Sequence, residues 1–178
     1  MGLAPPKKNT WSQSVMSDTT RDPTAPAQWI AGWYYGVDSK DKRDDILKCY
    51  KANDDLTNNL YDAMEAYIAG DTKTGDEKMD DSRPLFKDAM SGCSEGITGD
   101  LLDIYQQIKD MMDKPDWKDY AEKVYKENKV MVDRDIDLEF REWKQGVFFN
   151  SGMFAGMVSK IFLPEPTPEV YSLENAPV

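Results

Sequence analysis

Prolines gather at the two ends of this 178-residue chain and leave its middle almost free of them. Four of the ten prolines fall within residues 1–28 and four within 164–178, whereas only Pro84 and Pro115 lie between. Proline has no backbone N–H donor and disfavours helix at the residue before it, so neither end can form much regular structure of its own. We predict an extended N-terminal arm over 1–28, a folded domain over 29–163 and an extended C-terminal tail over 164–178.

The middle of the chain has enough apolar residues for one core of ordinary size, since 40% of the whole sequence is hydrophobic. These residues recur at steps of three and four, and evidence for strands is poor throughout. The spacing predicts an all-α fold. We expect an irregular helical bundle of three long helices and one or two short ones, flanked by the extended proline-rich arms.

Capping residues, first-turn prolines and terminal glycines set the bounds of the three long helices. They are predicted over about 40–70, 84–112 and 115–146. Several glycines inside the second helix can kink or split it. The acidic stretch 71–81 lacks helical periodicity and is predicted to be a surface loop. It also fails the calcium-loop pattern, because Lys73 and Gly75 occupy positions that need oxygen ligands.

The segment 147–163 is the most apolar part of the chain, and no charged residue occurs from Gln145 to Ser159. It is short for a membrane span, which needs about 20 residues. We expect a core helix here. The alternative is contact with a membrane or with hydrophobic subunits through 147–163.

Aromatic residues cluster before and after the three long helices along the sequence. Such residues often anchor protein interfaces, although packing into the chain's own core is the favoured interpretation position by position. The candidate interface residues are Trp29, Trp33, Tyr34, Tyr35, Phe148, Phe149 and Phe154. Three glycine pairs also have a spacing of four residues that lets helix backbones approach closely. They are Gly32 and Gly36, Gly92 and Gly96, and Gly152 and Gly156.

Charge and the lack of histidine exclude several classes of function. With 33 acidic and 22 basic residues the formal charge is −11, which disfavours nucleic acid as a partner. The chain has no histidine, the commonest general base and a frequent zinc ligand, and only two cysteines. The G-x-S-x-G match at 92–96 lies in a helical pattern and lacks a histidine base. We predict no catalytic residue, no cofactor and no metal.

The two cysteines, Cys49 and Cys93, each lie on the apolar face of a predicted helix. Antiparallel packing of those helices can bring the sulfur atoms together in a disulfide. Two separate buried thiols are the other interpretation. It is slightly favoured, because nothing else in the sequence indicates an oxidising compartment.

These features favour a non-catalytic structural accessory subunit of a large multiprotein assembly, whose partners are other protein subunits. An extended arm acquires a fixed shape by lying along another surface, and the apolar segment indicates a membrane-associated organellar complex. We expect an intracellular protein, with mitochondria as the candidate organelle. The first alternative is a soluble helical carrier for a lipophilic ligand. The second is an enzyme that works with carboxylates, tyrosine or lysine.

Overall fold

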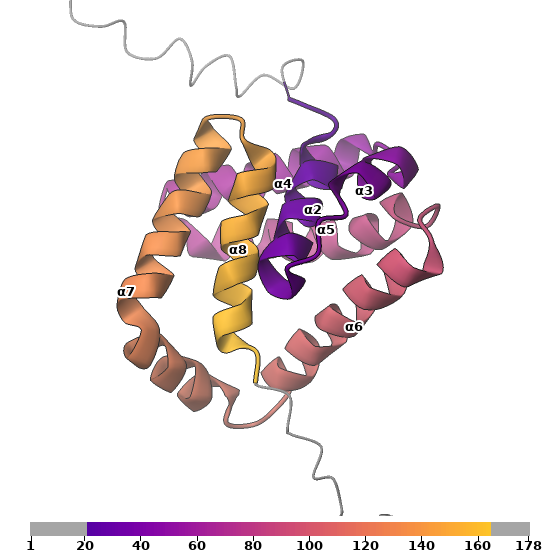
Figure 1. Cartoon of the computed structure of the whole chain (residues 1–178). Helices are drawn as coiled ribbons and strands as arrows, with labels where there is room; N and C mark the ends of the chain where they lie inside the picture. Colours follow the sequence, from indigo (N-terminus) through magenta and orange to yellow (C-terminus); the bar gives the residue numbers. More distant parts are fainter. Residues whose placement is uncertain (1–20, 165–178) are drawn as a thin grey trace, which may run out of the picture.

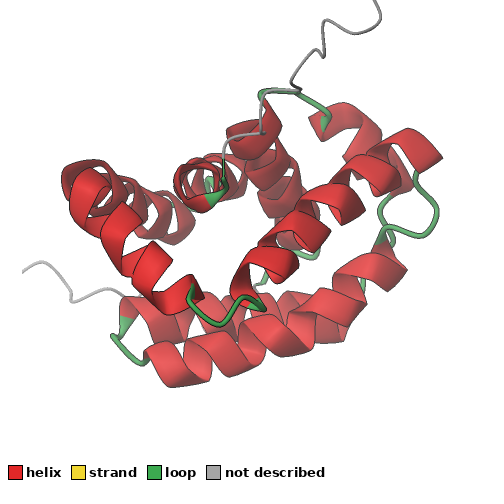
Figure 2. Cartoon of the chain, turned by 90° about the horizontal axis from the view of Figure 1, so that it is seen from below, coloured by secondary structure: helices red, strands yellow, loops and turns green. Residues whose placement is uncertain are grey.

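The computed structural model describes residues 21–164, and all regular structure in this range is helical (Figure 2). The prediction of an all-α fold is confirmed. The helices, labelled as in Figure 1, are α2 Ala25–Asp38, α3 Arg43–Cys49, α4 Asp54–Ile68, α5 Thr72–Ala89, α6 Glu95–Met112, α7 Trp117–Lys144 and α8 Phe148–Phe162. Residues 1–20 of the predicted arm and 165–178 of the predicted tail lie outside the described residues.

The first described helix, α2, begins inside the predicted arm. It starts at Ala25 with Pro26 in its first turn, where the missing N–H of proline costs nothing. The whole aromatic segment is helical, and α2 ends where Ser39 takes a left-handed conformation with φ 59°. The first predicted long helix, over about 40–70, is divided into α3 and α4. The backbone is extended at Tyr50, and Asn53 caps the start of α4.

The loop prediction for 71–81 is wrong, because these residues form most of the first three turns of α5. Asp71 caps the helix by accepting a hydrogen bond from the Thr74 backbone N–H at 3.1 Å. Gly75 then lies so close to α4 that a Cβ atom on it would stand 2.5 Å from the Tyr67 ring. A cap and a tight contact with α4 thus stabilise a helix that its polar sequence does not predict.

The second predicted long helix is divided by a turn at 90–94, so that α6 is a separate helix. The third prediction, 115–146, matches α7 closely. Helix α7 bends at Asn128, whose backbone is non-helical and whose side chain donates to the Val124 carbonyl at 2.9 Å. Gly146, with φ 75°, allows the turn into α8.

Helices α2 and α8 run in the same direction side by side at the centre of the molecule (Figure 1). Glycines from both helices lie in the contact. A Cβ atom on Gly36 would stand 2.2 Å from the Met153 carbonyl oxygen, and one on Gly156 would stand 2.2 Å from that of Trp33. Two of the three glycine pairs noted in the sequence therefore meet each other and let the backbones touch.

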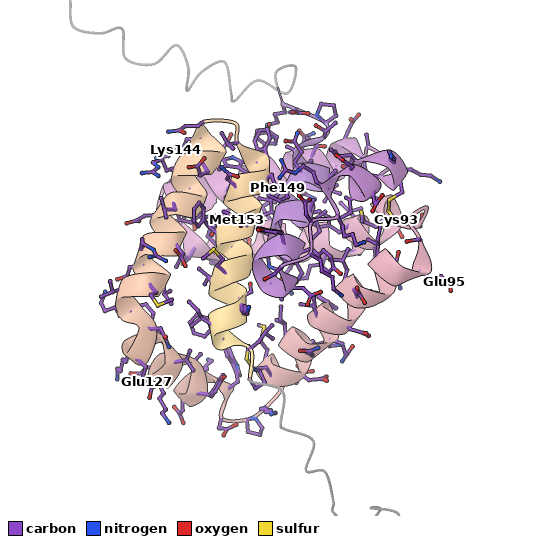
Figure 3. The ribbon with its side chains drawn as sticks, viewed as in Figure 1. Cys93, Glu95, Glu127, Lys144, Phe149 and Met153 are labelled. Carbon is purple, nitrogen blue, oxygen red and sulfur yellow. A yellow bond between two sulfur atoms is a disulfide. The ribbon has the colours of Figure 1, made fainter. Side chains whose placement is uncertain are left out.

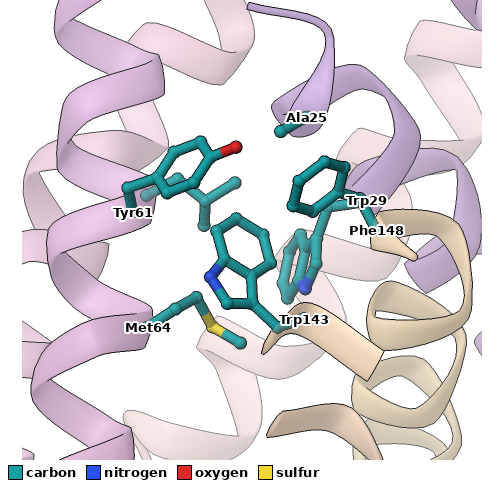
Figure 4. Close-up of a cluster of buried hydrophobic side chains, with 7 residues drawn as sticks. Ala25, Trp29, Tyr61, Met64, Trp143 and Phe148 are labelled. Atoms are coloured by element: carbon teal, nitrogen blue, oxygen red, sulfur yellow. The ribbon is translucent and has the colours of Figure 1, made fainter. Parts of the chain in front are cut away.

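A cluster of large side chains joins this central pair to α4 and α7 (Figure 4). The Trp143 ring meets Tyr61 and Phe148 edge-on, with both pairs of ring centroids 4.9 Å apart. Edge-to-face aromatic pairs add about 1 kcal/mol beyond the area they bury. The N-terminal end of the described chain is held on the same cluster, where Arg21 lies over the Tyr61 ring.

Candidate functional site

Four of the seven predicted interface residues lie in the chain's own core. Trp29, Tyr34, Phe148 and Phe149 are buried, whereas Trp33 and Phe154 are half-buried and Tyr35 is exposed. The four buried rings face other helices of the same chain, so they are core residues rather than surface anchors. Sequence periodicity alone did not separate these two roles, because α2 and α8 are apolar on most of their circumference.

The apolar segment 147–163 forms α8, whose Gly152 and Gly156 lie against α2. Its other neighbour is α7, which the turn at Gly146 folds back against it. This is the core position that we expected of it. None of the helices within residues 21–164 combines the length and the apolarity needed to cross a membrane.

Cys49 and Cys93 are joined by a disulfide, with their Cα atoms 4.9 Å apart (Figure 3). The sequence left open a disulfide or two separate buried thiols, and the structure has the disulfide. Cys49 is the last residue of α3, and Cys93 lies two residues before α6. The bond therefore fixes the end of α3 to the start of α6, and the Lys51 backbone N–H donates to the carbonyl of Ala89 at the end of α5.

A cavity of about 620 Å³ opens beside this disulfide, between the end of α2, helix α3 and the start of α6. We call it the basic cleft, because three lysines line it in a chain that is otherwise acidic. Its lining residues are Tyr34, Lys40, Lys42, Asp45, Lys48, Cys49, Ser94, Gly96, Ile97 and Asp100.

One wall of the basic cleft is fixed by a hydrogen bond between α2 and α6. The fully buried Tyr34 donates its phenol proton to Asp100 Oδ2 at 2.6 Å. This bond, followed by the nearby Lys40 ammonium, lowers the pKa of the Asp100 carboxyl. Burial and the same carboxylate raise the pKa of Tyr34, so the phenol remains a donor at neutral pH.

The three lysines of the basic cleft differ in their partners. Lys40 Nζ lies 3.1 Å from an oxygen of Asp38 and 3.5 Å from one of Asp100. The hydrogen bond with Asp38 is the main reason that the pKa of Lys40 is raised. Lys42 and Lys48, by contrast, form no salt bridge within residues 21–164. Two ammonium groups in the basic cleft are therefore available to an anion from outside.

The basic cleft borders a buried apolar cluster through Ile97. Ile46 and Ile97, from α3 and α6, belong to one buried cluster that also contains Phe149 of α8. The guanidinium of Arg43, also in α3, lies over the Phe149 ring, 3.5 Å from its centre. Helix α3 is thus attached to the core by both an aliphatic and a cation–π contact.

A second cavity, of about 410 Å³, lies on the first half of α7 and has the opposite charge balance. It is lined by Asp119, Glu122, Lys123, Lys126 and Glu127. Lys126 is paired with Glu122 one turn earlier, at 2.6 Å. This cavity serves as a control for the basic cleft, because its three acidic residues outnumber its two lysines.

Exposed apolar side chains are concentrated on α6 and α7. On α6, Leu102, Tyr105 and Met112 are 43%, 41% and 40% exposed, and we call these three residues the α6 strip. Val130 and Met131 of α7 are exposed as well. Helix α6 has only two buried residues, Ile97 and Ile104, so it lies at the margin of the fold.

Several features that suggest chemistry in the sequence are not brought together. Ser94 of the G-x-S-x-G match is exposed, and its neighbour Cys93 is held in the disulfide. Within the described part of the chain, no three Cys, Asp or Glu side chains are placed to hold a metal ion. Glu139, whose pKa burial raises to about 8, lines neither of the two cavities.

The basic cleft was missed at the level of sequence, although a signal for it exists. Residues 39–51 hold five basic side chains and three acidic ones, a reversal of the charge of the whole chain. Compared with known proteins, the chain matches no family model, no curated protein and no solved structure. Its function is therefore inferred from the surfaces described above.

Proposed function

We propose that this protein is a non-catalytic structural subunit of a multiprotein assembly and that it binds another subunit through the α6 strip. The observation that carries the proposal is the exposure of Leu102, Tyr105 and Met112 at about two fifths of each side chain. Their spacing of three and seven residues places them on one face of α6. Aromatic and methionine side chains are enriched at protein interfaces, and tyrosine is a common anchor.

The position of α6 supports this proposal. Its inward face supplies Ile97 and Ile104 to the core, which is enough to attach the helix to the rest of the chain. The strip contributes no side chain to the three buried clusters. Apolar residues gathered on one face of a helix form a patch of the kind that marks protein interaction sites.

The net charge of the chain indicates the chemistry of the partner. The chain as a whole carries a formal charge of −11, and Asp103 and Asp110 are exposed on another face of α6. We infer a partner surface with an apolar centre bordered by lysine or arginine. Opposite charges at the rim of an interface speed association and select the correct partner. Association of the assembly with an organellar membrane stays a prediction from the sequence.

A pair of charge substitutions on α6 tests the proposal. Tyr105→Glu adds one negative charge to the α6 strip, whereas Gln107→Glu adds the same charge on another face of the helix. In extracts of the cells that make the protein, we expect Tyr105→Glu to move it from a large particle toward its monomer mass of 20.3 kDa. Gln107→Glu keeps the large particle. Circular dichroism checks that both variants are folded. Equal particle masses for the two folded variants contradict the proposal.

The two alternative functions gain no specific support. A lipophilic carrier needs an apolar cavity, but both cavities described above have charged walls. The enzyme considered needs a buried carboxyl with a shifted pKa in a cleft, but Glu139 lies outside both cavities and the Asp100 side chain in the basic cleft is 45% exposed.

A further inference from the structure

We propose that the basic cleft binds a small anion that carries two or more phosphate groups. The primary observation is the convergence of Lys40, Lys42 and Lys48 on one cavity. The first two come from the connection between α2 and α3, and the third comes from α3 itself. Lysine acts as a point charge toward phosphate oxygens, so a site of this kind needs no planar, bidentate geometry.

Two lysines of the basic cleft carry a charge that no salt bridge among the described residues neutralises. Its lining has three lysines and two carboxylates, Asp45 and Asp100, and Lys40 also pairs with a third carboxylate, Asp38. Asp100 is occupied by the Tyr34 phenol and by Lys40. Lys42 is half-buried and Lys48 exposed, and neither has a salt-bridge partner in the described structure. An incoming anion can therefore pair with both without breaking a salt bridge, and its charge would add to that of the Asp100 carboxylate, which Lys42 already attracts.

The start of α6 adds donors to the same cavity. Ser94 makes no side-chain cap, although the first N–H groups of a helix have no partner within it. Gly96 and Ile97, in the first turn, both line the basic cleft. No atom lies within 4 Å of the place where a Cβ atom on Gly96 would stand, which leaves room for oxygen atoms beside the backbone. Helix starts of this kind favour phosphate, and here they reinforce the lysines.

The size and rigidity of the basic cleft define the class of ligand. A volume of about 620 Å³ lies within the range of small-molecule sites and exceeds what a single phosphate ion fills. The Cys49–Cys93 disulfide and the Tyr34–Asp100 hydrogen bond hold two of its walls. A preformed site loses little entropy on binding, so we infer a compact ligand with at least two anionic groups.

Calorimetric titration of the full chain with inorganic pyrophosphate tests this inference. We expect saturable binding that weakens as the salt concentration rises. The double variant Lys42→Gln, Lys48→Gln should bind at least tenfold more weakly. The matched control, Lys123→Gln with Lys126→Gln, removes the same charge from the acidic cavity of α7 and should bind as the wild type does.

Three outcomes overturn the inference. They are the absence of saturable binding up to on the order of 10 mM pyrophosphate, an equal loss of affinity in both double variants, and unchanged affinity in the Lys42 and Lys48 variant. Melting curves establish that each variant is folded before it is titrated. Tyr105→Glu should retain pyrophosphate binding, because the α6 strip is outside the basic cleft. Failure of the anion site is therefore distinguishable from failure of the proposed subunit function.

Discussion

The carbonyl oxygen of Phe149 lies directly against Gly32. A Cβ atom on Gly32 would stand only 1.9 Å from that oxygen. The relationship is reciprocal, because a Cβ on Gly152 would lie 1.9 Å from the carbonyl oxygen of Trp29. Real Cβ atoms do not approach backbone oxygens so closely, and neither backbone can give way without parting the helices. The central contact between α2 and α8 therefore depends on glycine at these positions.

Gly32→Ala should lower the free energy of unfolding by about 3 kcal/mol, the upper part of the range for overpacked cores, because its new methyl group meets backbone. Gly99→Ala is the matched control. No atom lies within 4 Å of a Cβ at Gly99, so alanine should raise helix stability by up to about 1 kcal/mol. Urea denaturation measures both changes, and a Gly32→Ala protein as stable as the wild type contradicts the close contact.

Arg21→Ala should cost about 2 kcal/mol of unfolding free energy, as expected for charged hydrogen bonds at a protected site. The Arg21 side chain is 6% exposed, and it donates to Asn58 Oδ1 at 3.0 Å and to Asp62 at 2.9 Å. Arg83→Ala removes an exposed pair with Asp80 and should cost less than about 0.5 kcal/mol. Thermal unfolding compares the two, and similar small effects would mean that Arg21 does not secure the chain to α4.

Removal of the disulfide should destabilise the protein by about 4 kcal/mol on the loop-entropy estimate, because Cys49 and Cys93 are 44 residues apart. The double variant Cys49→Ser, Cys93→Ser provides the measurement by chemical denaturation. Added reductant should lower the stability of the wild type and leave that of the double variant unchanged. Insensitivity of the wild type to reductant under unfolding conditions argues that the bond is not formed.

Glu139 should make the protein less stable as pH rises from about 4.5 to 8. Burial raises the pKa of this carboxyl from 4.5 to about 8, so between these values the folded state binds more protons than the unfolded state. Stability therefore falls as pH rises through this window. Relative to Glu139→Gln, the wild type should lose about 3 to 4 kcal/mol between pH 5 and pH 8. Parallel stability curves for the two proteins would show that Glu139 ionises normally.

Features set by a single residue's backbone were predictable from the sequence. Gly146 was expected to end the third long helix, and it takes φ 75° two residues after α7 ends. Gly70 takes φ 82° near the predicted end of the first. Both residues adopt a conformation that glycine tolerates and other residues rarely do. The period of three and four residues likewise predicted helix over the apolar segments, and the structure has helix there.

Features that depend on distant contacts were not predictable. The polar residues 71–81 become helical where Gly75 packs against Tyr67 of another helix. Three glycine pairs share one spacing, but Gly92 and Gly96 do not approach another helix as Gly32 and Gly152 do. Lysines 40, 42 and 48 form a cleft only because the disulfide and Tyr34 bring α6 beside them. These contacts join residues that are far apart in the chain, so the local sequence does not specify them.

The mass of the native particle tests the central claim, that this protein works as a subunit bound to other proteins. Size-exclusion chromatography with light scattering, applied to the protein at natural abundance from the cells that make it, measures this mass. We predict a stable particle far above the 20.3 kDa of the single chain. A monomer of 20.3 kDa contradicts the account.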